Sequence, residues 1–346
     1  MATDFGPALE TVARDAARRL GSDVHGVESV EGGGNNRLYR MQLANGRTVA
    51  LKTYLQQASD PRDRHGAEVA GLRFLGDAGV DAVPAALADD AEAGWAAFSW
   101  VDGEAPQDHG ARDIVQALDF MASLKRLRAN DEADALAPAS EACLAADDLI
   151  EQISLRIARL SAVPDHALVR LLDNGVRDAF WSGLDRASRR FTAAGLDVHR
   201  PIEPRFETLS PSDFGFHNAL RGRDGRLTFV DFEYFGRDDP VKLVSDFLLH
   251  PGMDLSEAQS RQYLRGALAL YGADPDFVLR LEALFPLYAV RWSLILLNAF
   301  LPERRARQVY AGDGDALDRV LGRQLDKAES MLNRLNDLEG WLTDDA

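Results

Sequence analysis

The chain has 346 residues and carries 55 acidic against 39 basic side chains, so its formal net charge is −16 with neutral histidines. Apolar residues make up 46% of it, which is enough for a hydrophobic core and excludes a disordered or fibrous protein. The excess of negative charge repels phosphate backbones and anionic lipids, so we expect neither nucleic acid nor a membrane surface as a partner. Composition leaves the oligomeric state open.

The first hundred residues combine helical and strand-like patterns. The periodicity predicts helices over 7–20 and 62–79 and strands over 26–31, 38–43, 47–54 and 95–101. Asn45-Gly46 is a strong hairpin signal, so a glycine-rich stretch at 32–34 lies one hairpin before the strand that carries Lys52. On that strand the side chains of Lys52 and Leu51 lie on opposite faces.

The pattern changes after Asp102-Gly103-Glu104, which interrupts an apolar strand. Helical patterns follow over 111–130, 140–161, 164–194, 255–271, 276–300 and 313–340, with one strand-like island at 205–233. We therefore expect an α+β protein with a small β-rich N-lobe over 1–103 and a larger, mostly helical C-lobe over 104–346.

Several features favour a cytoplasmic location. Apolar runs such as 294–297 are far shorter than a membrane span, and the N-terminus lacks the pattern of a signal peptide. The single cysteine, Cys143, cannot form an intramolecular disulfide and has no CxxC partner for a metal site.

The island at 205–233 contains three side chains with oxygen atoms that a hairpin would bring together. Asp213 and Asn218 lie five residues apart on one loop, and the strand after the Asp224-Gly225 turn returns Asp231 to the same place. Mg²⁺ prefers oxygen ligands and usually takes one or two from the protein, and Asn218 and Asp231 suit that role.

Phosphoryl transfer also needs a carboxylate to orient the attacking hydroxyl and a cation for the nucleotide phosphates. Asp213 fits the first requirement and Lys52 the second. A buried lysine needs an ion-pair partner, and Glu68 on the following helix is a natural one, although nearby arginines offer Glu68 other partners. The glycine stretch would let the backbone approach the phosphates closely.

The order of these motifs resembles that of the protein-kinase-like fold, and in finer detail the aminoglycoside phosphotransferases and choline/ethanolamine kinases. Residues 230–234 read Val-Asp-Phe-Glu-Tyr, which is similar to the Ile-Asp-Phe-Glu-Tyr of the choline kinases. The first loop, similar to Gly-Gly-x-Ser/Asn-Asn-x-x-Tyr/Phe, consists of Gly32, Gly33, Gly34, Asn35, Asn36, Arg37, Leu38 and Tyr39. The resemblance covers about residues 25–250 and implies ATP as donor, Mg²⁺ as cofactor and a small hydroxyl-bearing acceptor.

One departure concerns the catalytic loop. The family usually has His-Gly-Asp or His-Asn-Asp there, whereas this chain has Pro211-Ser212-Asp213. The family's histidine supports the loop, so its loss bears on loop geometry more than on chemistry, and it leaves a catalytically degenerate nucleotide-binding regulator as an alternative. His217 stands beside Asn218, but kinase chemistry needs no histidine base and we assign it no catalytic role. Asp246 matches a family position that stabilises the loop.

The acceptor is the part that the sequence specifies least. Tyr288 and Trp292 lie four residues apart on one helical pattern, and with Tyr234 and Arg291 they could line an acceptor pocket or simply belong to the core. Aromatic faces attract ammonium groups, which favours an amino alcohol or an aminoglycoside-like acceptor. A sugar kinase on the same fold is the alternative. Glu233 could lie near the metal or only hold the strand end.

Overall fold

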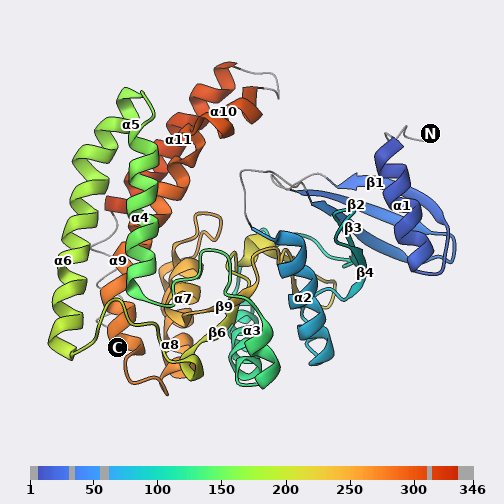
Figure 1. Cartoon of the computed structure of the whole chain (residues 1–346), viewed down its shortest axis with the longest axis horizontal. Coiled ribbons are helices and arrows are strands. Elements are labelled where there is room, and N and C mark those ends of the chain that lie inside the picture. Colours follow the sequence, from blue (N-terminus) through green and yellow to red (C-terminus); the bar gives the residue numbers. More distant parts are fainter. Residues whose placement is uncertain (1–6, 31–35, 55–61, 310–313, 334–346) are drawn as a thin grey trace. The chain divides into compact units, whose positions relative to one another are not determined.

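The computed structural model of the chain describes residues 7–30, 36–54, 62–309 and 314–333. Two compact units are present: one combines Met1–His109 with Asp119–Ser140 and Leu209–Arg237, and the other combines Gly110–Leu118 with Glu141–Thr208 and Asp238–Ala346. We call them unit 1 and unit 2. Strands dominate the early part of the chain and helices the later part, as expected for an α+β protein (Figure 1). Because each unit draws on separate segments, the lobe boundary at residue 103 stays a prediction.

The main sheet of unit 1 has five antiparallel strands in the order β1-β2-β3-β5-β4. The β2–β3 hairpin turns at Asn45-Gly46, as predicted, and Gly46 has a φ of +84° that glycine adopts without strain. The strands are β1 (Val24–Val30), β2 (Asn36–Leu43), β3 (Thr48–Tyr54), β4 (Ala86–Asp90) and β5 (Trp95–Ser99). Sequence analysis missed β4, because this half-buried edge strand has no apolar alternation.

One face of this sheet packs on helix α1 (Pro7–Arg19), which places Ala13, Ala16 and Ala17 against Leu51 and neighbouring core residues. Because side chains alternate along a strand, the face opposite Leu51 carries Lys52. Helix α2 (Arg64–Asp77) begins with Asp63 as its N-cap, whose carboxylate accepts from the Gly66 amide at 2.8 Å. The alternation predicted for β3 is confirmed, and it separates the hydrophobic core from the charged face.

A second part of unit 1 is the short hairpin of β7 (Ala219–Arg221) and β8 (Leu227–Phe229). Phe229 from this hairpin stacks on Phe120, with ring centroids 4.7 Å apart, and packs on Phe214 at 4.9 Å. These buried ring contacts fix both ends of the segment that runs from Phe214 to β8.

Unit 2 contains most of the helices. They are α3 (Ala111–Arg128), which continues into unit 1, α4 (Ala146–Ser161), α5 (His166–Leu171), α6 (Arg177–Ala194), α7 (Pro240–Leu249), α8 (Glu257–Tyr271), α9 (Phe277–Leu297), α10 (Pro302–Val309) and α11 (Gly314–Asn333). Short strands β6 (Thr208–Ser210) and β9 (Gly236–Asp238) lie where the chain passes between the units. The helix expected over 164–194 is divided by a π-helical turn at Leu172–Val176. Helix α7 is buried along nearly its whole length, and sequence analysis did not predict it.

Helix α9 corrects the expectation that no apolar run approaches a membrane span. The stretch Phe277–Phe300 is long and apolar enough to cross a bilayer by length and composition, with a mean hydropathy of 1.4. However, 83% of that window is buried inside the protein, and α9 packs against α4, α6, α7 and α11. A helix that is apolar on all sides and covered by other helices is typical of the centre of a helical core.

Candidate active site

Lys52 on β3 is buried and lies among three carboxylates in unit 1, of which Glu68 and Glu233 are buried and Asp231 is partly exposed. Its Nζ atom donates to Glu68 Oε2 at 2.6 Å and to Asp231 Oδ1 at 2.7 Å, and it lies 3.7 Å from Glu233 Oε2. The predicted ion pair with Glu68 is therefore confirmed. Burial alone lowers the pKa of Lys52, but Glu68, Asp231 and Glu233 outweigh burial and raise it above the usual value. Lys52 stays positively charged at neutral pH.

Glu68 on α2 holds Lys52 in place through a fully enclosed carboxylate. Its Oε2 atom also accepts from the Tyr54 hydroxyl at 2.8 Å, and its Oε1 atom accepts from the backbone amide of Phe232 at 3.3 Å. Burial raises the pKa of Tyr54 well above its usual value, and Glu68 raises it further, so the phenol remains a donor. Through these contacts Glu68 connects β3 and α2 to the strand end that carries Asp231.

Asp231 occupies the left-handed backbone region, with a φ of +67°. Most residues other than glycine, asparagine and aspartate avoid this region, and surrounding contacts help to hold Asp231 there. The Phe232 amide bond to Glu68 is one such contact. Another is a bond of 2.9 Å from the Val230 amide to the Asn218 carbonyl, which extends the β7–β8 hairpin. This bond brings Asn218 beside Asp231, as the sequence predicted.

Asp213 and Asn218 lie on the segment that leads into β7. The Asn218 Nδ2 atom donates to the Asp213 carbonyl at 2.9 Å, so the amide closes the loop on itself. The Asp213 carboxylate lies 3.0 Å from His217 Nε2 and is about two-fifths exposed (38%), which leaves it accessible to a substrate. Sequence analysis expected no direct role for His217 and did not predict this contact.

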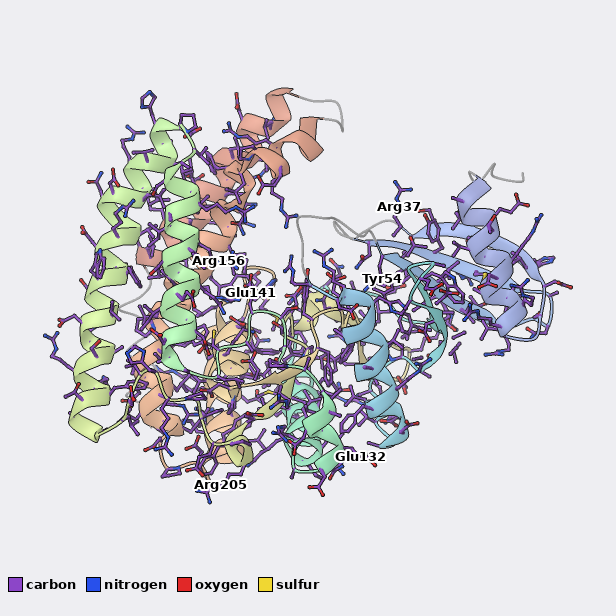
Figure 2. The ribbon with its side chains drawn as sticks, in the orientation of Figure 1. Arg37, Tyr54, Glu132, Glu141, Arg156 and Arg205 are labelled. Carbon is purple, nitrogen blue, oxygen red and sulfur yellow. The ribbon has the colours of Figure 1, made fainter. Side chains whose placement is uncertain are left out.

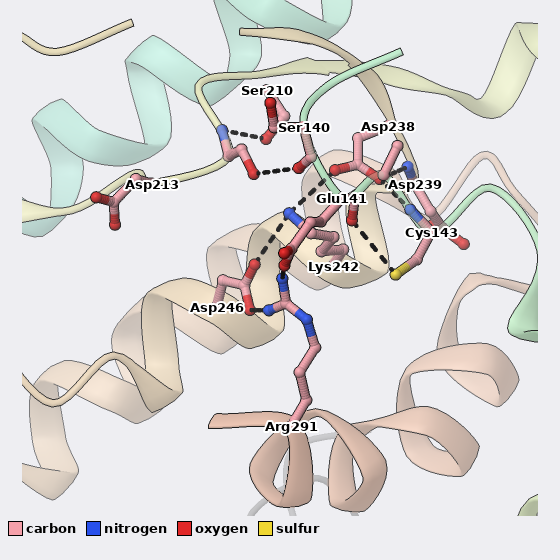
Figure 3. Close-up of polar contacts among 12 residues, drawn as sticks. Ser140, Glu141, Cys143, Ser210, Asp213, Asp238, Asp239, Lys242, Asp246 and Arg291 are labelled. Atoms are coloured by element: carbon pink, nitrogen blue, oxygen red, sulfur yellow. Dashed lines mark hydrogen bonds and ion pairs between the residues drawn. The ribbon is translucent and has the colours of Figure 1, made fainter. Parts of the chain in front are cut away.

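The residues that replace the family's histidine motif support the loop in another way. Ser212 has a φ of +66°, a backbone region that the usual glycine or asparagine adopts more readily. Its amide donates to Ser210 Oγ at 3.0 Å, and its hydroxyl donates to the Ser140 carbonyl at 3.0 Å (Figure 3). Two serine hydroxyls thus stabilise the turn immediately before Asp213.

Glu233 forms a second centre of charged contacts beside Lys52. It accepts a hydrogen bond from the Asn36 amide at the start of β2, and its Oε1 atom lies 3.9 Å from Arg64 Nε. Glu233 is buried and ties together β2, β3 and α2. Of the predicted phosphate loop, Gly32, Gly33, Gly34 and Asn35 lie outside the described residues, whereas Asn36, Arg37, Leu38 and Tyr39 belong to strand β2.

With this geometry established, comparison with known proteins places the chain. A model of the phosphotransferase enzyme family matches residues 26–281. The chain belongs to the phosphotransferase enzyme family. No match to it is found among curated protein sequences.

Solved structures similar to this phosphotransferase share its fold at low identity. A spectinomycin phosphotransferase in complex with ADP and spectinomycin is 12% identical, with a TM-score of 0.59, and the match covers 90% of this chain and 94% of that one. A choline kinase from Streptococcus pneumoniae is 15% identical, with a TM-score of 0.53 and coverage of 93% and 99%. A type I macrolide 2'-phosphotransferase is 16% identical, with a TM-score of 0.54 and coverage of 95% and 98%. The predicted protein-kinase-like fold is confirmed.

The donors of this phosphotransferase fit a magnesium ion. Asn218 and Asp231 are joined through the hairpin, and both side chains are partly exposed. Because Asn218 Nδ2 is bonded to the Asp213 carbonyl, the amide is oriented so that its Oδ1 atom can serve as a ligand. One amide oxygen and one carboxylate are what a Mg²⁺ ion that also binds phosphate oxygens and water takes from a protein. Their role as ligands stays a prediction.

The residues predicted for the acceptor pocket are divided between the two units. In unit 1, Tyr234 lies beneath two guanidinium groups, with Arg62 5.2 Å and Arg64 5.9 Å from the ring centroid. In unit 2, Tyr288 is completely buried on α9. These positions do not by themselves assign either tyrosine to an acceptor, and that role stays a prediction.

Arg291 is engaged in a polar network of unit 2 with Glu141 and Asp246 (Figure 3), and Trp292 also contacts Asp246. Arg291 contacts Asp246 Oδ1 at 3.3 Å and Glu141 Oε2 at 2.8 Å, and the Trp292 indole donates to Asp246 Oδ1 at 2.8 Å. Lys242, which is fully buried, lies 3.1 Å from Asp246 Oδ2. Asp246 therefore accepts from side chains of both α7 and α9. The support of the catalytic loop expected for it stays a prediction.

Some members of the site were missed although the sequence held a signal for them. Tyr54 lies two residues after Lys52, and strand periodicity puts both on one face. Arg64 lies four residues before Glu68 on α2, and helix periodicity puts both on one face. His217 follows Asp213 by four residues, but on an irregular loop no such periodicity applies.

Proposed function

We propose that this phosphotransferase uses ATP and Mg²⁺ to transfer the γ-phosphoryl group to a hydroxyl of a small molecule. The observation that carries the proposal is the set of contacts by which Lys52 joins Glu68 and Asp231 while the hairpin holds Asn218 beside Asp231. Phosphoryl transfer depends on positioning and charge neutralisation rather than on covalent chemistry, and this arrangement supplies both.

Each residue has a separate part in the proposed reaction. Lys52 neutralises the nucleotide phosphates, and Glu68 keeps its ammonium group in place for them. Asp213 orients the acceptor hydroxyl and accepts its proton as the bond to phosphorus forms. Asn218 and Asp231 would hold Mg²⁺, which when bound neutralises charge on the phosphate oxygens. The bond to the leaving ADP breaks in line with the attacking oxygen.

The acceptor that we propose is an amino alcohol or an aminoglycoside-like molecule. Support comes from the acidic composition of the chain, with a net charge of −16, and from structural neighbours named for spectinomycin, choline and ethanolamine. The sugar kinase alternative is tested by the same experiment. We also propose that the enzyme acts in the cytoplasm, where ATP is available and where a buried free thiol such as Cys143 remains reduced.

The experiment that tests the function is incubation with Mg·ATP and an extract of small metabolites, followed by mass spectrometry. An acceptor that gains the mass of one phosphoryl group with the wild type, but not with Asp213→Asn, supports the proposal and identifies the acceptor. Replacing ATP by GTP tests the donor. Nucleotide binding without turnover across a broad panel of amino alcohols, aminoglycosides and sugars would instead support the degenerate regulator.

A further inference from the structure

His217 contacts the proposed base through its side chain. Its Nε2 atom lies 3.0 Å from Asp213 Oδ1, within hydrogen-bond distance. An ionised carboxylate only accepts hydrogen bonds, so in this contact the imidazole donates from Nε2. The two oxygens of a carboxylate can accept about four hydrogen bonds, so the bond to His217 leaves capacity for an acceptor hydroxyl.

The loop around Asp213 is held by contacts that do not involve this imidazole. Phe216 is buried and stacks on His109, with ring centroids 4.5 Å apart. The backbone amide of Asn218 donates to the Gly215 carbonyl at 3.1 Å, and the side-chain Nδ2 atom of Asn218 donates to the Asp213 carbonyl. These contacts fix the backbone of the loop, whereas the bond from His217 acts on the carboxylate itself.

The orientation of the Asp213 carboxylate must be fixed in addition to the loop backbone, because the base must point at the acceptor hydroxyl. A carboxylate on a short side chain that is partly exposed can rotate about χ1 and χ2, and a misplacement of about 1 Å can cost about 100-fold in rate. A side-chain donor at 3.0 Å restricts that rotation. The His217 imidazole supplies such a donor.

We propose that His217 is a positioning residue, which donates a hydrogen bond from Nε2 to Asp213 and so holds the carboxylate in the orientation that accepts the hydroxyl proton. The inference rests on the proposed function of Asp213 as the base. It assigns His217 no contact with substrate and no proton transfer. His217 also compensates for the catalytic-loop histidine that this chain lacks, because it restrains the Asp213 carboxylate from the C-terminal side of the loop.

The kinetic test compares His217→Leu with His217→Gln. The leucine removes the donor, and we expect kcat to fall about 10- to 100-fold with the acceptor KM changed less than about twofold. Glutamine can donate from its own Nε2, so we expect His217→Gln to recover most of kcat. The matched control is His25→Leu, at an exposed position on β1, which should retain the wild-type kcat.

A double-mutant cycle then asks whether His217 acts through Asp213. In the Asp213→Asn background, His217→Leu should lower the residual rate by less than about twofold, because the carboxylate that it positions is gone. Independent, multiplicative losses would overturn the proposal, as would an unchanged kcat in His217→Leu alone. A rise in acceptor KM at constant kcat would instead make His217 a binding residue and would also overturn it.

A readout without turnover separates this inference from the proposed function. In the NMR spectrum of ¹⁵N-histidine-labelled enzyme, the Nε2–H signal of His217 should move in Asp213→Asn, while the signal of His25 should not. If the wild type phosphorylates no acceptor but this shift is seen, the proposed function fails and the His217 contact stands. An unmoved signal overturns the positioning role whatever the enzyme transfers.

Discussion

The Tyr54 hydroxyl donates a 2.8 Å hydrogen bond to Glu68 Oε2, the atom that also accepts from Lys52. The residue that aligns the lysine is thus itself aligned by the next side chain on the lysine's face of the strand. Tyr54→Phe removes this donor and keeps the ring, and we expect a loss of about 1 to 3 kcal/mol in the free energy of unfolding. Urea unfolding followed by circular dichroism measures it.

Glu68→Ala should have a larger effect than Tyr54→Phe, because it leaves the buried Lys52 ammonium without its main partner. Removing one member of a buried ion pair costs about 3 to 5 kcal/mol. We also expect the KM for ATP to rise, since an unrestrained lysine no longer meets the phosphates. A Glu68→Ala protein with the stability and nucleotide KM of the wild type would contradict the role given to this pair.

Asp231 offers a test of the metal site that can be separated from backbone strain. Asp231→Ala should abolish turnover, and Asp231→Asn should do the same without adding backbone strain, because asparagine tolerates the φ of +67°. Both variants also remove the carboxylate that pairs with Lys52. The coupled assay for ADP measures turnover, and thermal unfolding measures stability. Asp224→Ala, in the exposed β7–β8 turn, is the matched control and should be as active as the wild type. Transfer at the native rate by Asp231→Ala would show the assignment to be wrong.

Ser212 tests how the loop before Asp213 is supported. Ser212→Val places a β-branched residue at a φ of +66° and removes the hydroxyl bond to the Ser140 carbonyl, so we expect a loss of about 2 kcal/mol in stability and a lower kcat. Ser212→Gly loses the same bond but relieves the strain, so it should fall between valine and wild type. Equal stability of the valine and glycine variants would argue against strain at this turn.

The lowered pKa of Glu141 predicts that the stability of the folded state decreases as the pH falls in the acid range. Glu141 pairs with Arg156 (Figure 2). Burial raises the pKa of Glu141, but Arg291 and Arg156 outweigh burial and lower it from 4.5 to about 2. A carboxylate whose pKa is lowered by folding stabilises the folded state above its unfolded pKa, and this contribution is lost as pH falls. Melting temperatures of the wild type and Glu141→Gln should therefore converge between pH 4.5 and 2. Glu132→Gln, at an exposed position, is the control and should show no such convergence.

Much of the site was readable from the sequence because its members are ordered along the chain by local rules. Strand alternation placed Lys52 opposite Leu51, helix spacing placed Glu68 behind the sheet, and the turn at Asp224-Gly225 returned Asp231 to Asn218. These are short-range consequences of backbone geometry. Strand and helix periodicity likewise predicted the α+β class, and composition gave the acidic charge.

Only the tertiary structure decided which partner each polar group takes. The Asn36 amide meets Glu233 across 197 positions, and Arg291 meets Asp246 and Glu141 from a distant helix. The His217 contact with Asp213 depends on an irregular loop, for which periodicity gives no rule. Residue types and spacing determine which groups can form hydrogen bonds or ion pairs. The choice among many equivalent charged groups depends on packing, which brings one donor within about 3 Å of one acceptor and excludes water from the buried pair.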